Sequence, residues 1–134
     1  MEAEREFDRG TGDTLYSGRP MAFVNLGLSG LQLDQKEGAE AAFTRALSMD
    51  RRNSAALLEM GFLRLEAGDT EEAARYHSDY RATAPTQSPR SLLLGLEIAS
   101  AVGDWDTMGS YELALRNLYP DSSEYRLWVE RQSR

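Results

Sequence analysis

Cysteine is absent from this 134-residue chain, and histidine occurs once. Without cysteine the chain can form no disulfide, perform no thiol chemistry and hold no metal through thiolates. Basic residues are also few, with 15 Lys and Arg against 22 Asp and Glu and a net charge of −7. A surface that binds nucleic acid or an anionic membrane needs a basic patch, so this balance argues against both classes of partner.

Long apolar runs are missing as well. No stretch approaches the roughly 18 apolar residues that a membrane-spanning helix requires, so we expect no membrane insertion by this chain. The first residues, Met1 to Asp8, are charged from the start and do not resemble a signal peptide.

A repeat is present instead. Three glycines, each preceded by a large apolar residue, are spaced 34 residues apart: Gly27, Gly61 and Gly95. A period of 34 is typical of the tetratricopeptide repeat, a helix–turn–helix unit that stacks into a superhelix and binds other proteins. The sequence therefore predicts an all-α, right-handed tetratricopeptide-repeat superhelix of about three repeats with a C-terminal capping helix.

The repeat register sets the expected boundaries. Residues 1–19 are the remnant of a preceding repeat and a loop, and residues 20–131 form the repeat domain. We expect repeats at 20–53, 54–87 and 88–121 and the capping helix at 122–131. The helices predicted within them are 20–33, 36–49, 54–67, 70–83, 89–102, 105–118 and 122–131. The turn around Gly103 carries one extra residue.

Local sequence features, the glycines and the helix caps, support this repeat register. Glycine in a helix interior costs about 1 kcal/mol relative to alanine, so three at one spacing indicate that each admits a closely packed neighbour. Capping boxes, in which an acidic or hydroxyl side chain precedes a glutamate by three residues, open the later helices. They are Asp34 to Glu37, Asp69 to Glu72 and Asp121 to Glu124.

Four stretches carry a more specific likeness. They are Asp13-Thr-Leu-Tyr16, Asn25-Leu-Gly-Leu28, Ser91-Leu-Leu-Leu-Gly95, and Leu118-Tyr-Pro120 followed by Glu124-Tyr125. In order and spacing they resemble the C-terminal part of the type IV pilus biogenesis lipoproteins, the PilF/PilW pilotin family. The resemblance implies a non-catalytic periplasmic scaffold, anchored at the outer membrane by a lipid, that helps the secretin reach that membrane and assemble.

The chain departs from that family at its start. Family members begin with a signal peptide, a lipidated cysteine and further repeats, none of which is found here, so anchoring is not carried over. The chain is either a trimmed piece or a short homologue. An alternative function is that of a generic cytoplasmic repeat adaptor with an unrelated protein partner.

The inner face of such an array is built from four positions of each first helix, and here it is apolar. The predicted protein-binding groove comprises Val24, Leu28, Leu31, Leu58, Phe62, Leu65, Leu92 and Leu96. It suits a helix or an extended apolar segment, with Phe62 at its centre. The alternative is that tight winding, or the C-terminal helix, covers these residues.

No residue pattern indicates catalysis, a cofactor or a metal. His77 stands where an aromatic residue normally packs, and its neighbours four residues away, Ala73 and Arg81, complete no ligand set, so we interpret it as structural. Trp105 and Trp128 are predicted core anchors. For Trp128 the alternative is an exposed binding hot spot.

The expected partner is a protein, by resemblance the pilus secretin. A second expected contact is self-association through the N-terminal end. There the helix from Pro20 to Leu33 lacks the neighbour that a preceding repeat would supply, which leaves apolar residues such as Phe23 without full cover unless residues 2–8 and the loop fold back.

Overall fold

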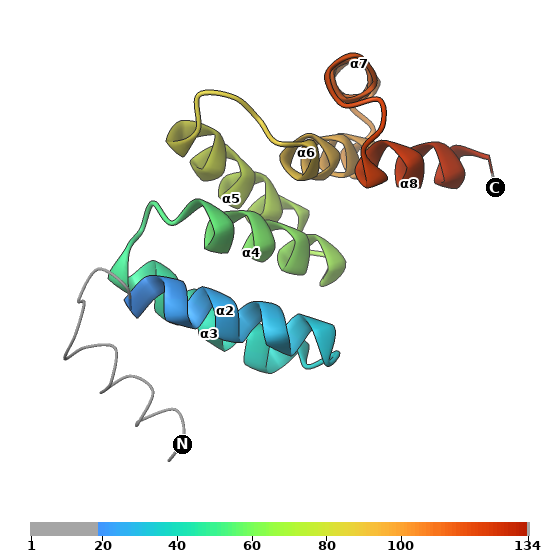
Figure 1. Ribbon diagram of the computed structural model, residues 1–134. Coiled ribbons are helices and arrows are strands. Elements are labelled where there is room, and N and C mark those ends of the chain that lie inside the picture. Colours follow the sequence, from blue (N-terminus) through green and yellow to red (C-terminus); the bar gives the residue numbers. More distant parts are fainter. Residues whose placement is uncertain (1–18, 134) are drawn as a thin grey trace. The chain divides into compact units, whose positions relative to one another are not determined.

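The computed structural model describes residues 19–133, which form seven helices and no strand (Figure 1). The helices are α2 (Arg19–Gln32), α3 (Lys36–Met49), α4 (Ser54–Glu66), α5 (Thr70–Thr83), α6 (Pro89–Val102), α7 (Trp105–Leu118) and α8 (Ser123–Gln132). Every predicted helix is present, with ends within one residue of those expected. The all-α tetratricopeptide-repeat class is therefore confirmed. None of these helices combines the length and apolar character needed to cross a bilayer.

The chain divides into two compact units, residues 1–60 and 61–134. The division falls inside α4, so it does not coincide with the predicted repeat boundary at 53/54, which stays a prediction. The predicted remnant and loop at 1–19 lie outside the described residues, apart from Arg19.

One turn geometry links the two helices of each repeat. It places a residue with positive φ just after the first helix: Asp34 (59°), Gly68 (86°) and Gly103 (76°). In each case the next backbone N–H donates to a carbonyl near the end of that helix, as from Asp69 to Arg64 at 2.9 Å. These bonds satisfy carbonyls that the helix leaves unpaired. The spacing of 34 and then 35 residues confirms the extra residue before Gly103.

Two predicted caps are wrong, the first of them because of this turn. Asp34 occupies the left-handed turn position and cannot cap α3, whose N-cap is Gln35 without a side-chain bond. Asp121 lies one residue too early, since Ser122 caps α8 by accepting from the Tyr125 N–H. The cap at Asp69 is confirmed, because its carboxylate accepts from the Glu72 N–H.

In the first unit, α2 packs along α3 (Figure 1). Gly27 lies directly under the Phe43 ring, where a Cβ on residue 27 would come within 2.7 Å of the ring. Phe43 is completely buried, as is Ala39, which lies against Gly30. Phe23, expected to lack full cover unless residues 2–8 and the loop fold back, is only 1% exposed. The Arg45 guanidinium lies 4.7 Å from its ring centroid.

In the second unit, α6 packs against α5, α7 and α8. Its core contains Leu92, Leu93, Leu96, Leu115 and Trp128. Gly95 faces two rings, because a Cβ there would lie 2.7 Å from Tyr111 and 2.8 Å from His77. Gly61 instead faces the Leu94 side chain. The three repeat glycines are thus all positions of close approach, as the spacing predicts.

We predict that Gly95→Ala destabilises the fold by about 1–3 kcal/mol, because the added methyl overlaps two rings, both of which must shift to admit it. The matched control is Gly109→Ala in the middle of α7. No atom lies within 4 Å of the new methyl there, so alanine should stabilise by up to about 1 kcal/mol. Chemical denaturation of both variants measures the difference, and equal effects at the two sites would contradict the close-packing account.

Candidate protein-binding surface

The eight residues of the predicted groove differ in accessibility. In the first unit Val24 and Leu58 are buried, Leu31 is half-buried and Leu28 is 39% exposed. In the second unit Phe62 and Leu65 are half-buried, whereas Leu92 and Leu96 are buried. That these positions form one continuous groove stays a prediction.

The C-terminal helix covers the third-repeat part of this face. Trp128 of α8 is 3% exposed and packs with Leu92, Leu96 and Leu115 in one core cluster. The predicted role of Trp128 as a core anchor is confirmed, and its alternative role as an exposed hot spot is wrong. Leu92 and Leu96 can contact a partner only if α8 moves.

Two polar contacts attach α8 to its neighbours. The Trp128 indole N–H donates to the Glu112 carboxylate of α7 at 2.6 Å, and Arg131 forms an ion pair with Glu97 of α6. The indole bond satisfies a buried donor and also fixes the orientation of the ring. The ion pair is half-exposed on its arginine side, so it contributes little stability but adds a directional contact.

The Phe62 side chain is less accessible than its repeat position predicts. Its ring packs against the buried cluster of the second unit, and the Arg90 guanidinium lies 4.2 Å from the ring centroid. Such a cation–π contact is worth about 0.5–1 kcal/mol at an accessible site. Phe62 therefore contributes to folding as well as to the surface.

Leu65 borders a hollow beside α8. The hollow has a volume of about 440 Å³, and its walls combine apolar groups with the Glu97–Arg131 pair. Its lining residues are Leu65, Glu97, Ser100, Ala101, Trp128, Arg131 and Gln132. Of the predicted inner face, Leu65 lines this hollow. In residues 19–133 no group of three or more possible ligand side chains could hold a metal ion.

His77 has the structural position expected from the sequence. It is buried in α5, and its Nε2 lies 3.0 Å from the Ser91 carbonyl oxygen, which can only accept, so Nε2 carries the hydrogen. Gln87 and the Ser91 hydroxyl lie within 3.2 Å of the same nitrogen. Burial lowers the pKa of His77, and the nearby Arg81 charge acts in the same direction, against the opposing Ser91 and Gln87 bonds.

Comparison with known proteins is informative for nearly the whole chain, although no protein-family model matches it. The type IV pilus assembly protein PilF of Pseudomonas aeruginosa is 38% identical over 125 residues, which are 93% of this chain. Over nearly its whole length, the chain is a relative of PilF. It spans about half the length of its curated PilF relative, 49%.

Solved structures of the family agree. The Pseudomonas aeruginosa PilF structure matches with a TM-score of 0.78 at 36% identity, over 90% of this chain and 54% of that one. PilW, a type IV pilus biogenesis factor, matches with a TM-score of 0.72 at 27% identity, over 96% of this chain and 58% of that one. The likeness to PilF and PilW thus covers both units.

Some residues of this PilF/PilW relative were placed wrongly or missed from the sequence. Trp105, a predicted core anchor, is 63% exposed because it is the first residue of α7 and lies outside the core. Sequence reasoning also missed the Glu97–Arg131 and Glu112–Trp128 contacts. Only the placement of α8 against α6 and α7 reveals these pairs, since their members are 34 and 16 residues apart.

We predict that stability falls as the pH drops below about 6.5, the ordinary pKa of histidine. A lowered pKa in the folded state means that the unfolded chain binds the proton first. The stability that depends on neutral His77 is therefore fully present above pH 6.5, and it is lost as the pH falls towards the folded-state pKa. His77 is the one histidine of the chain, so its NMR titration should have a midpoint below 6.5.

The control is His77→Gln, which should flatten the dependence of unfolding free energy on pH between 7 and about 5.5, above the usual carboxylate range. A midpoint at or above 6.5, or an unchanged slope in the variant, would contradict this assignment.

Proposed function

We propose that this chain is a non-catalytic protein-binding scaffold in type IV pilus biogenesis that assists the outer-membrane secretin to reach its membrane and assemble. The observation that carries this proposal is the 38% identity to PilF over 93% of the chain. It favours a pilus role over the unrelated cytoplasmic adaptor. By the same likeness we propose that the full-length protein acts in the periplasm at the outer membrane.

The fold supports a binding role. Helical repeats present accessible apolar side chains along first helices, and partners dock as helices or extended segments. In the second unit the accessible members of the predicted groove are Phe62 and Leu65, next to the hollow beside α8. An apolar partner segment that fills this hollow would contact Leu65 and the edge of Trp128 together.

A substitution at Leu65 tests this surface more specifically than one at Phe62. Phe62 packs on the core cluster, so a polar substitution there would lower stability and binding together. Leu65 is half-buried, near the end of α4. A change at Leu65 therefore leaves most of the core in place.

We predict that Leu65→Asp weakens binding to purified secretin by about fivefold or more, because a charge replaces an apolar side chain of the proposed interface. The matched control is Leu118→Asp, which makes the same chemical change at a side chain of α7 that is 65% exposed. Titration calorimetry measures affinity, and circular dichroism verifies that both variants remain helical.

The results distinguish a wrong partner from a wrong binding surface. If unaltered protein does not bind the secretin, the partner assignment is wrong. If it binds and Leu65→Asp binds as well as Leu118→Asp, the partner uses another surface.

A further inference from the structure

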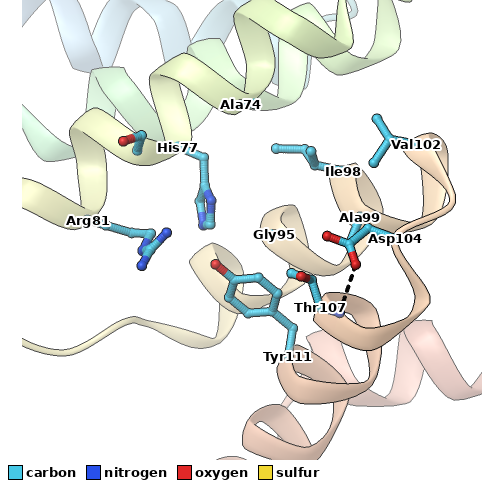
Figure 2. A pocket seen from close by; sticks show the side chains of 11 residues that line it. Ala74, His77, Arg81, Gly95, Ile98, Ala99, Val102, Asp104, Thr107 and Tyr111 are labelled. Atoms are coloured by element: carbon cyan, nitrogen blue, oxygen red, sulfur yellow. Dashed lines mark hydrogen bonds between the residues drawn. The ribbon is translucent and has the colours of Figure 1, made fainter.

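A second pocket lies in the second unit, bounded by α5, α6 and α7 (Figure 2). It has a volume of about 180 Å³ and shares no lining residue with the hollow beside α8. Its apolar wall includes Ala74, Ile98 and Val102, and its polar wall includes His77, Arg81 and Tyr111. The proposed secretin-binding surface does not use it.

The size of the pocket limits what it can hold. Sites for whole small molecules usually measure about 300–1,000 Å³, well above this volume. An apolar cavity of about 150 Å³ in another protein holds one benzene. The pocket therefore suits a single side chain of the size of phenylalanine or leucine, presented by a larger molecule.

The charges at the two ends are unequal. Arg81 lies at one end, and among the residues that the structure describes no carboxylate pairs with it. Its positive charge reaches the interior, since it contributes to lowering the pKa of His77. Figure 2 shows the Tyr111 hydroxyl pointing towards this end.

The other end carries Asp104, which is already engaged. Its carboxylate accepts from the Thr107 N–H at 3.2 Å as the N-cap of α7. Hydrogen bonds from the Thr107 side chain and then from this N–H lower the pKa of Asp104. The positive end of the helix dipole partly offsets this negative charge. Asp104 is therefore engaged at the N-terminus of α7. The charged group of the pocket that can pair with a ligand is the Arg81 guanidinium, which attracts an anion.

We propose that this pocket is a docking point for an acidic segment of a partner protein, which inserts one phenylalanine- or leucine-sized side chain and sets a neighbouring carboxylate against Arg81. The apolar wall removes the side chain from water, and the ion pair orients the segment. Because Arg81 is exposed, the ion pair contributes more to specificity than to affinity.

The test is a titration of the full ¹⁵N-labelled chain with a capped Ser-Phe-Asp-Ser peptide, followed by NMR. Saturable shifts are expected at the amides of His77, Gly95 and Tyr111. A peptide with Ala in place of Phe should produce none. A peptide with Lys in place of Asp should bind about two- to fivefold more weakly, the usual range for an exposed ion pair.

Three variants locate the site. Arg81→Gln should remove the difference between the Asp and Lys peptides, whereas Arg116→Gln, a matched exposed arginine of α7 outside the pocket, should preserve it. Ala74→Phe should block binding, because residue 74 is exposed and its new ring would fill the pocket from the rim.

Absent shifts with unaltered protein would overturn the proposal. So would equal binding of the Asp and Lys peptides, or unchanged binding by the Ala74→Phe variant. If Ala74→Phe fails to fold, the comparison of Arg81→Gln with Arg116→Gln decides the matter on its own.

Discussion

The contact between a glycine and an aromatic ring sixteen residues later governs how closely helices pair in this chain. Phe43 lies on Gly27 and Tyr111 lies on Gly95, and any Cβ at either glycine would overlap the ring. Glycine lowers the stability of a helix. The dispersion contacts and apolar burial that the close approach permits must therefore offset this loss. The same contact fixes α7 against α6, which in turn provides the surface on which Trp128 and α8 pack.

The middle repeat modifies this contact, and the pocket bounded by α5, α6 and α7 adjoins the change. Gly61 faces Leu94. The His77 ring instead lies against Gly95, and its Nε2–H donates to the Ser91 carbonyl oxygen. An imidazole fills less volume than a phenyl ring, and it lines the pocket beside Tyr111. A polar residue at a core position thus joins α5 to α6 by hydrogen bonds as well as by packing.

The repeat period predicted the helices well because each helix end is set by local chemistry and repeated at a fixed interval. It failed where two local roles compete for one residue. Asp34 resembles a cap but serves the left-handed turn, and Trp105 resembles a core residue but begins a helix. For α6 the apolar stripe predicted part of a binding groove, with cover by the C-terminal helix as the alternative, and Trp128 of α8 packs over it. The Trp128–Glu112 and Arg131–Glu97 contacts that attach α8 there depend on tertiary placement and do not follow from the period.

We propose that this PilF/PilW relative contacts the secretin through the accessible surface around Leu65. Site-specific photo-crosslinking tests this contact, with benzoylphenylalanine in place of Leu65 and, in a second variant, in place of the exposed Leu118. Irradiation of piliated cells should crosslink the secretin from position 65 and not from position 118. Crosslinks from position 118 alone, or to proteins other than the secretin from position 65, would contradict the account.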